Sequence, residues 1–212
     1  MLLIVLASAS VTAEPPAALD GPRVLEQVQR WLDDTRDLQG RFEQTLVSGA
    51  FGAGLQERGR LYVSRPGRMR FDYLEPEHKI AVVDGERTWL YLEEDAEMMR
   101  GRLEDTGDLL PTLLAGKRPL ALIFEATLDS AEGLDEPPAY RLRLTPFGGS
   151  DAFESVVVTV DPPEFGIVSA EVLDAAGNRM LYRFSEMIRN GGVDPALFSF
   201  EPPPGTTVSG TP

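Results

Sequence analysis

The chain has 212 residues, of which 42% are hydrophobic and 25% are charged, a length and balance that suit one globular domain with a substantial core. The formal net charge of -14 disfavours nucleic acid as a partner and broad adhesion to anionic lipid, because both need a basic surface. Cysteine is absent, which excludes disulfides, thiol nucleophiles, cysteine-based metal sites and a lipid anchor on an N-terminal cysteine.

Residues 1–13 form an apolar run that ends in small residues, with Val11 and Ala13 spaced as at a signal-peptidase site. The run is too short to span a bilayer, and it lacks the basic start of a signal peptide, which indicates a start further upstream. We therefore expect residues 1–13 to be a signal peptide and the mature, exported chain to begin near Glu14. The alternative is an ordinary N-terminal segment of the fold.

A first helix is predicted after Asp20, whose side chain can cap it, with Pro22 in its first turn. Apolar residues then recur at helical spacing on one stripe, for which core packing is the ordinary interpretation: Val24, Leu25, Val28, Trp31 and Leu32.

From residue 40 to residue 103 the apolar period changes to two, which is typical of strands, and Asp84-Gly85 is a hairpin turn signal. Further strands are predicted at residues 140–145, 153–160, 167–173 and 179–188, with Pro- and Gly-bearing turns between them. The tail from residue 201 is predicted to be extended and mobile at its end.

The apolar period of two stops in the middle of the chain. Residues 108–116 and 119–124 are predicted to form two short helical pieces around a Gly-Lys-Arg-Pro corner. They carry too many apolar side chains for an exposed connector, so they need a surface to cover.

These elements predict a mainly β fold with some α: an unclosed antiparallel β-barrel, formed by one curved sheet and covered by a helical lid. No long linker divides residues 14–212, so one domain is expected. An apolar cavity should lie between sheet and lid, although the alternation does not decide which strand face points inward, and tight packing without a void is the alternative. The predicted wall residues are Leu61, Val63, Met69, Phe71, Trp89 and Tyr91, and the predicted lid residues are Leu109, Leu113, Leu120 and Phe124.

Residues suited to catalysis are scarce. The one histidine, His78, lies in a charged turn without a serine motif or metal-ligand spacing beside it, which favours a solvated surface residue. Glu93, Glu94 and Asp95 resemble an exposed hairpin tip, whereas acid–base pairs need burial to shift their pKa values. The pattern predicts no enzyme, no metal site and no cofactor.

Several blocks, in order along the chain, resemble the LolA family of periplasmic carriers of outer-membrane lipoproteins. They are residues 40–45 (Gly-Arg-Phe-Glu-Gln-Thr), 59–66 (Gly-Arg-Leu-Tyr-Val-Ser-Arg-Pro), Asp84-Gly85, 89–91 (Trp-Leu-Tyr) and the Asn-Gly-Gly, Phe-Ser-Phe and Pro-Pro-Pro-Gly segments within residues 190–208. Each block is weak alone, but the ordered set is fairly specific.

The resemblance implies a periplasmic, monomeric carrier whose cavity takes the acyl chains of lipoproteins. It also implies two partners, an inner-membrane ABC transporter that releases lipoproteins and an outer-membrane receptor of similar fold. Arg65 matches the family's arginine that hydrogen-bonds to the lid backbone and holds the cavity shut; the alternative is an edge charge before a turn. Met69 departs from a large aromatic residue implicated in handover, but it remains apolar and adaptable.

Two other classes stay open. A lipid- or lipoprotein-sensing module of the same fold would regulate a membrane signalling partner and usually carries a second domain. A periplasmic lipid-processing enzyme would need a nucleophile constellation that the sequence does not show.

Overall fold

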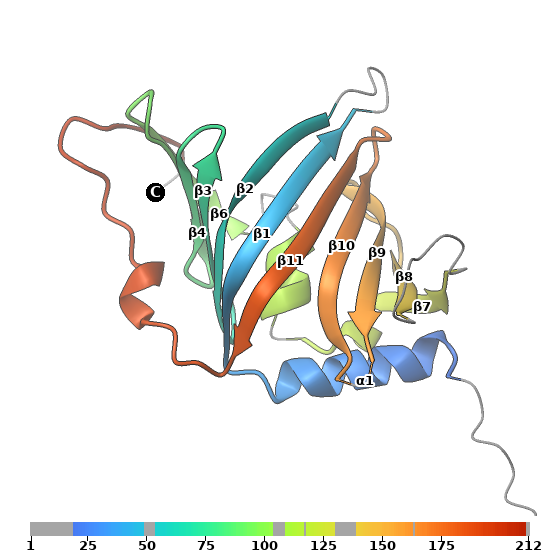
Figure 1. Cartoon of the computed structure of the whole chain (residues 1–212). Coiled ribbons are helices and arrows are strands. Elements are labelled where there is room, and N and C mark those ends of the chain that lie inside the picture. The colour runs from blue at the N-terminus through green and yellow to red at the C-terminus, as the bar shows by residue number, and fades with distance from the viewer. Residues whose placement is uncertain are drawn as a thin grey trace, which may run out of the picture.

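The computed structural model describes residues 19–48, 54–103, 109–116, 118–129, 139–162 and 164–210. The predicted signal peptide at residues 1–13 and the expected new terminus at Glu14 lie outside these residues. Figure 1 shows one curved sheet with α1 crossing beneath it and shorter helical pieces on its concave side.

Helix α1 spans Gly21–Asp33 and begins as predicted, because the Asp20 side chain accepts a hydrogen bond from the Arg23 N–H at 3.0 Å. Its apolar stripe packs under the second half of the sheet, with Val24, Leu25, Val28 and Leu32 buried. Just after the helix, the buried Thr35 hydroxyl donates to the Trp31 carbonyl at 2.6 Å.

In chain order the strands are β1 (Asp37–Val47), β2 (Gly54–Ser64), β3 (Arg68–Glu75), β4 (Lys79–Val83), β5 (Arg87–Leu92), β6 (Glu97–Arg102), β7 (Phe124–Leu128), β8 (Tyr140–Pro146), β9 (Phe153–Asp161), β10 (Gly166–Asp174), β11 (Arg179–Arg189) and β12 (Thr207–Gly210). Several strands, such as β2 and β3, alternate between buried and less buried side chains, as the period of two predicts, whereas β9 buries four consecutive side chains and β12 is exposed throughout.

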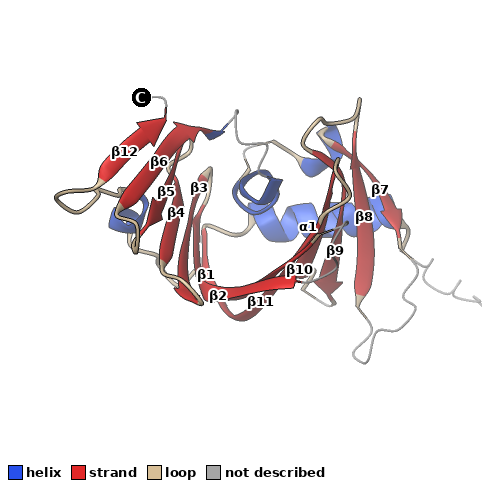
Figure 2. Cartoon of the chain, turned by 90° about the horizontal axis from the view of Figure 1, so that it is seen from above, coloured by secondary structure: helices blue, strands red, loops and turns tan. Residues whose placement is uncertain are grey.

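In the described part of the chain these strands form one sheet in the order β12-β6-β5-β4-β3-β2-β1-β11-β10-β9-β8-β7. Neighbours are antiparallel except for β12, which pairs parallel with β6. Because β12 and β7 lie at opposite edges and do not pair, the sheet curls without closing, as Figure 2 shows from above. The predicted unclosed, lid-covered barrel is therefore confirmed.

The chain between β6 and β7 turns into the concave side of the sheet. It contains one helical turn at Pro111–Ala115 (η1), preceded by helical residues Leu109 and Leu110, and a second at Leu120–Leu122 (η2). In Figure 1 the first of these is the yellow-green helix behind β1 and β11. Two short helical pieces are thus present where the sequence predicts them, although the second ends at Leu122.

The segment after β11 covers the convex face of the first half of the sheet. The short helix η3 (Pro195–Phe198) buries Phe198, and the Leu197 carbonyl accepts a hydrogen bond from the Arg70 guanidinium at 3.0 Å. The tail then returns as β12, where backbone pairing with β6 holds residues 207–210. Residues 211–212, at the end that is predicted to be mobile, lie outside the described residues.

Candidate functional site

The concave wall comes from β2 and β3. Val63 pairs directly with Met69 and Leu61 with Phe71, so these four apolar side chains share one face. All four are buried, and the Phe71 ring meets the Phe42 ring edge-on at 4.9 Å. Phe42 can lie flat on the sheet because its partner on β2 is Gly59, where a Cβ atom would come within 2.8 Å of the Phe42 ring.

The lid residues fill the concavity from the other side. Leu109 and Leu113 lie on the first helical segment, and Leu120 starts the second; all three are buried in the same core as the wall. Phe124 also faces this core, but as the first residue of β7 and not as part of the lid, because alternation puts Phe124 and Ala126 inward.

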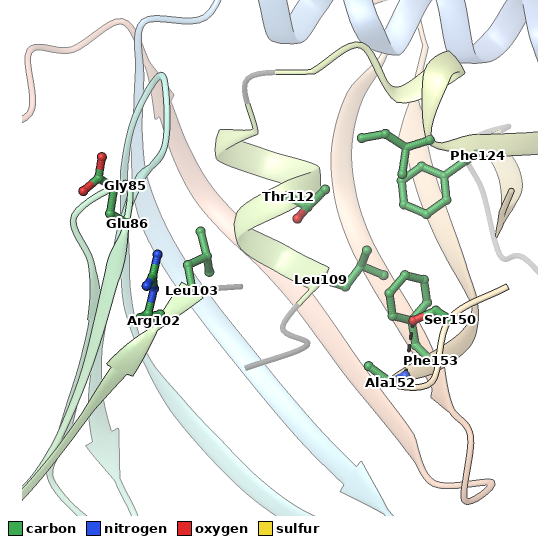
Figure 3. A pocket seen from close by; sticks show the side chains of 11 residues that line it. Gly85, Glu86, Arg102, Leu103, Leu109, Thr112, Phe124, Ser150, Ala152 and Phe153 are labelled. Atoms are coloured by element: carbon green, nitrogen blue, oxygen red, sulfur yellow. Dashed lines mark hydrogen bonds between the residues drawn. The ribbon is translucent and has the colours of Figure 1, made fainter. Parts of the chain in front are cut away.

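The centre of the concavity is closed in this form. Leu61, Val63 and Leu113 are fully buried, and Met69 is 1% exposed, so wall and lid interlock there. Open volume lies toward the edges of the lid. A cavity of ≈ 640 Å³ separates the β4–β5 turn and the end of β6 from the loop before β9, with Leu109, Thr112 and Phe124 on its lining (Figure 3).

A second cavity, of ≈ 340 Å³, lies at the end of the sheet away from α1, between Leu109 and Leu110 of the lid and the concave faces of β1, β3, β10 and β11. A third, of ≈ 230 Å³, lies at the α1 end and is lined by Trp31, Leu61 and Leu114 among others. A large continuous apolar cavity would require the lid to move.

The assignment of Trp89 and Tyr91 to the concave wall is wrong. Phe71 pairs with Ala81 and Ala81 with Leu90, so Leu90 shares the face of Phe71, and its neighbours point to the opposite side. Tyr91 is buried on the convex face against Phe200 of the C-terminal segment, with 5.5 Å between ring centroids. The sequence alternation was correct, but the segment that buries this face comes from far along the chain.

Arg65 lies in the turn between β2 and β3, and its guanidinium donates a hydrogen bond to the Leu114 carbonyl at 2.7 Å. One residue further along the lid, the Ala115 carbonyl accepts from the Gly67 N–H at 2.6 Å. Gly67 has a φ of 88°, a conformation that glycine adopts without steric cost, so the turn can present this N–H to the lid. The turn therefore binds two consecutive carbonyls at the lid's C-terminal end, where helical carbonyls lack internal partners.

The Arg65 side chain is only 12% exposed. Burial lowers the pKa of its guanidinium, and the nearby Asp33 carboxylate opposes that effect. Arginine stays charged at neutral pH, so Arg65 holds the Leu114 carbonyl with a charge-assisted hydrogen bond.

Sequence reasoning missed the contribution of α1 to this contact. Asp33 lies 4.0 Å from the Arg65 guanidinium and accepts a hydrogen bond from the Gln29 amide at 2.7 Å. The same Gln29 side chain accepts from the Leu120 N–H at 2.8 Å. Arg65 thus binds the lid just before its corner, at Leu114, and Gln29 binds it just after the corner, at Leu120. Asp33 interacts with both of these side chains. The only sequence signal was that Gln29 and Asp33 lie four residues apart on one helix.

The residues considered for catalysis lie in solvent. The His78 side chain is 59% exposed and lies 3.3 Å from Glu93, and residues Glu93–Asp95 form an exposed turn. Across the described ranges, no group of three or more His, Asp or Glu side chains is placed to hold a metal ion. In the same ranges, no helix combines the length and apolarity needed to cross a membrane.

An open, curved sheet whose apolar concave face is covered by a helical lid, itself held by a few hydrogen bonds, defines a binding protein for apolar ligands. The sequence profile of the family described as outer membrane lipoprotein carrier protein LolA matches residues 33–201. The chain therefore belongs to the LolA family, as the resemblance predicted. Members of this family are carriers and not enzymes, which confirms the prediction of a non-enzymatic protein.

Curated relatives agree with this assignment. The outer-membrane lipoprotein carrier protein of Dechloromonas aromatica is 30% identical over 190 residues, covering 88% of this chain and 87% of the relative. The protein of the same name from Alcanivorax borkumensis is 31% identical over 200 residues, covering 88% and 92%.

Solved structures share the fold at lower identity. An uncharacterised conserved protein from Thermus thermophilus matches with a TM-score of 0.56 and 14% identity, covering 89% of this chain and 97% of that chain. MucB matches with a TM-score of 0.50 and 16% identity, covering 85% of this chain and 62% of MucB.

Proposed function

We propose that this protein is a periplasmic carrier that binds the acyl chains of lipoproteins released from the inner membrane and hands them to an outer-membrane acceptor. The proposal rests on the family membership, on relatives named outer-membrane lipoprotein carrier protein at about 30% identity, and on one structural observation. That observation is a lid whose leucines fill an apolar concavity and whose C-terminal end is held by Arg65.

The physical need for such a carrier follows from the cost of moving acyl chains through water. Each methylene transferred to water costs about 0.8 kcal/mol, so one long chain costs roughly 10 kcal/mol or more. A carrier must offer an extended apolar surface when loaded and must hide it when empty, because a large exposed apolar patch promotes aggregation. The lid leucines hide the wall of β2 and β3 in the form described.

Loading on this proposal displaces the lid from the wall, so that acyl chains contact Leu61, Val63, Met69 and Phe71 in place of the lid leucines. Spontaneous release into water would be very slow, so transfer requires direct contact at each end of the route. The partners expected are an inner-membrane ABC transporter that releases lipoproteins and an outer-membrane lipoprotein receptor, with the carrier itself acting as a monomer. Export would remove residues 1–13.

The proposal is tested by expressing the chain in a Gram-negative host and isolating it from the periplasm. Mass spectrometry of co-purified material should find intact triacylated lipoproteins bound in about one-to-one proportion, and the mature chain should begin near Glu14. Purified protein should also release lipoproteins from inner-membrane vesicles that hold the ABC transporter, in an ATP-dependent manner. Recovery of free phospholipid alone, with no release from the vesicles, would contradict the lipoprotein-carrier function.

A further inference from the structure

The ≈ 230 Å³ cavity at the α1 end of the sheet connects the proposed acyl-chain wall with the lid. Leu61 of the wall and Leu114 of the lid both line it, and both side chains are buried. Leu38 is a third buried lining residue, and it pairs directly with Val63 of the wall. A hydrocarbon chain that replaces the lid leucines on Leu61 can therefore continue from the wall into this cavity.

The interior of this cavity is apolar. Besides the three leucines, its lining includes Ile167 and Phe184, which are buried, and Trp31 and Met187, which are partly buried against the same core. An apolar cavity of about 150 Å³ in another protein stays dry and accepts a benzene molecule. A cavity of ≈ 230 Å³ with this lining therefore suits a hydrocarbon ligand.

Two glycines leave room for this lining. Gly40 pairs directly with Leu61, and a Cβ atom at Gly40 would overlap the Met187 sulfur. A Cβ atom at Gly166 would come within 3.2 Å of the Trp31 indole. Side chains at these two positions would displace Met187 and Trp31, so the glycines permit the present shape of the cavity.

The outer end of the cavity is charged. Asp161, Glu164 and Arg189 belong to its lining and are exposed, whereas the wall and lid residues at its inner end are buried. The Arg189 guanidinium lies 5.7 Å from the centre of the Trp31 ring. Hydrocarbon loses free energy when it passes from an apolar cavity into water, so a chain that enters from the wall should end beside Trp31.

We propose that this cavity receives the methyl end of an acyl chain of the cargo and thereby sets the chain length that the carrier binds best. The inference rests on the proposed carrier function and names the part of the cargo held at the α1 end. The polar end of the cargo is excluded from this place, because its ester and amide groups would lose their hydrogen bonds to water among apolar side chains. It lies instead toward the other end of the wall.

Tryptophan fluorescence tests this orientation. The chain has two tryptophans. Trp31 lines the cavity, and Trp89 lies on the convex side of the sheet. Bromine atoms quench tryptophan only at close range, so two synthetic triacylated lipopeptides are compared on the purified, delipidated protein. One is brominated at the methyl ends of its chains, and the other is brominated beside the carbonyl groups. Trp89→Phe leaves Trp31 as the reporter, and Trp31→Phe leaves Trp89 as the matched control.

In Trp89→Phe, the methyl-end bromines should remove most of the fluorescence of Trp31, and the carbonyl-side bromines should leave most of it. Trp31→Phe should keep its fluorescence with both lipopeptides. Wild type should lose part of its fluorescence with the methyl-end label alone, which gives the same comparison without any substitution. Displacement of N-phenylnaphthylamine, an apolar fluorophore, shows that each lipopeptide is bound.

Chain length provides a second test. Each further methylene buried in the cavity should tighten binding by roughly fourfold, so wild type should prefer palmitoyl to lauroyl lipopeptides. Ile167→Phe adds volume to a buried lining residue. It should weaken palmitoyl binding by roughly tenfold and leave lauroyl binding within about twofold of wild type. Ile188→Phe is the matched control and should match wild type, because Ile188 is 54% exposed. Thermal unfolding of both variants detects a folding defect, and the quenching comparison does not depend on either.

A bound lipopeptide whose methyl-end bromines leave Trp31 unquenched would overturn the inference, and so would equal quenching by the two labels. Equal loss of palmitoyl and lauroyl binding in a folded Ile167→Phe, or no loss of either, would also contradict it. These outcomes leave the carrier function standing, since the lipopeptide still binds. If neither lipopeptide displaces the fluorophore from wild type, the carrier function and the inference fail together.

Discussion

The two ends of the lid's first helical segment are held by different kinds of contact. At the C-terminal end, the carbonyls of Leu114 and Ala115 are bound by Arg65 and Gly67. At the N-terminal end, Leu109 packs against the sheet while bordering cavities of ≈ 640 and ≈ 340 Å³. The difference matters because acyl chains can replace leucine side chains on an apolar wall at little net cost, whereas they cannot replace a hydrogen bond.

Closure of the empty form should therefore depend on the hydrogen bonds at the C-terminal end of this helical segment. In the proposed loading step, the apolar contacts of Leu109 and Leu113 would be exchanged for acyl-chain contacts, whereas the Arg65–Leu114 hydrogen bond would be lost without replacement. A charge-assisted hydrogen bond contributes about 1–3 kcal/mol. This is large enough to favour a closed empty carrier and small enough for cargo to overcome.

The largest expected effect compares the two leucines. Leu113→Ala removes a fully buried side chain from the filled centre and should lower the free energy of unfolding by about 2–5 kcal/mol. Leu109→Ala should cost distinctly less, because Leu109 already borders open volume. Urea unfolding followed by circular dichroism measures both. Equal losses would contradict the distinction between a filled centre and a loosely packed N-terminal end.

Arg65→Leu directly tests the hydrogen bond at the C-terminal end of the lid's first helical segment. We expect the fold to remain intact and closure of the empty form to weaken by about 1–3 kcal/mol. The variant should load lipoprotein but release it poorly, because closing is part of what drives cargo out. The measurement is transfer of radiolabelled lipoprotein to acceptor-bearing membranes, with Arg60→Leu on the exposed face as the control. Wild-type transfer by Arg65→Leu would mean that the hydrogen bond to Leu114 has no role in handover.

Gln29→Ala should have a smaller effect in the same direction. It removes the acceptor of the Leu120 N–H and the donor to Asp33, so the closed lid should lose about 0.5–1.5 kcal/mol. A larger open population would tighten binding of an apolar fluorophore by up to roughly tenfold. Gln27→Ala on the same helix, which should leave fluorophore binding at the wild-type value, is the control. A null result for Gln29→Ala would restrict the lid contact to Arg65.

The smallest effect concerns Asp174 beside the ≈ 340 Å³ cavity. Hydrogen bonds from the Asn178 side chain, and then from the Asn178 backbone, lower the pKa of this carboxyl. A lowered folded-state pKa stabilises the fold above the ordinary aspartate range, about pH 4, and that contribution is lost as pH falls through the folded-state value. Asp174→Asn should therefore unfold more readily than wild type at pH 7, with the difference shrinking below about pH 4. Thermal melts across this range measure it, and a pH-independent difference would contradict the assignment.

Local pattern accounts for much of the fold. The period-two alternation predicted the strands from β1 to β6 and from β8 to β11 at the correct places, but it missed β7 and β12. Asp20 marked the start of α1. The leucine-rich segment between them could be recognised as a lid because so many apolar side chains need a surface. The role of Arg65 as a lid contact was favoured mainly through the family resemblance, since its partner, the Leu114 carbonyl, lies 49 residues away in the chain.

The sequence by itself determined where apolar and polar residues alternate, where the turns fall and that an apolar segment must cover the sheet. These features depend on neighbours along the chain. Only the tertiary structure decided which face of β5 lies on the concave side of the sheet. Trp89 and Tyr91 are as apolar as the wall residues, but Phe200 and the returning C-terminal segment bury their side of the sheet. The parallel pairing of β12 and the contact of Gln29 with the lid were likewise decided there. Each joins segments far apart in sequence, and no local period carries information about such a partner.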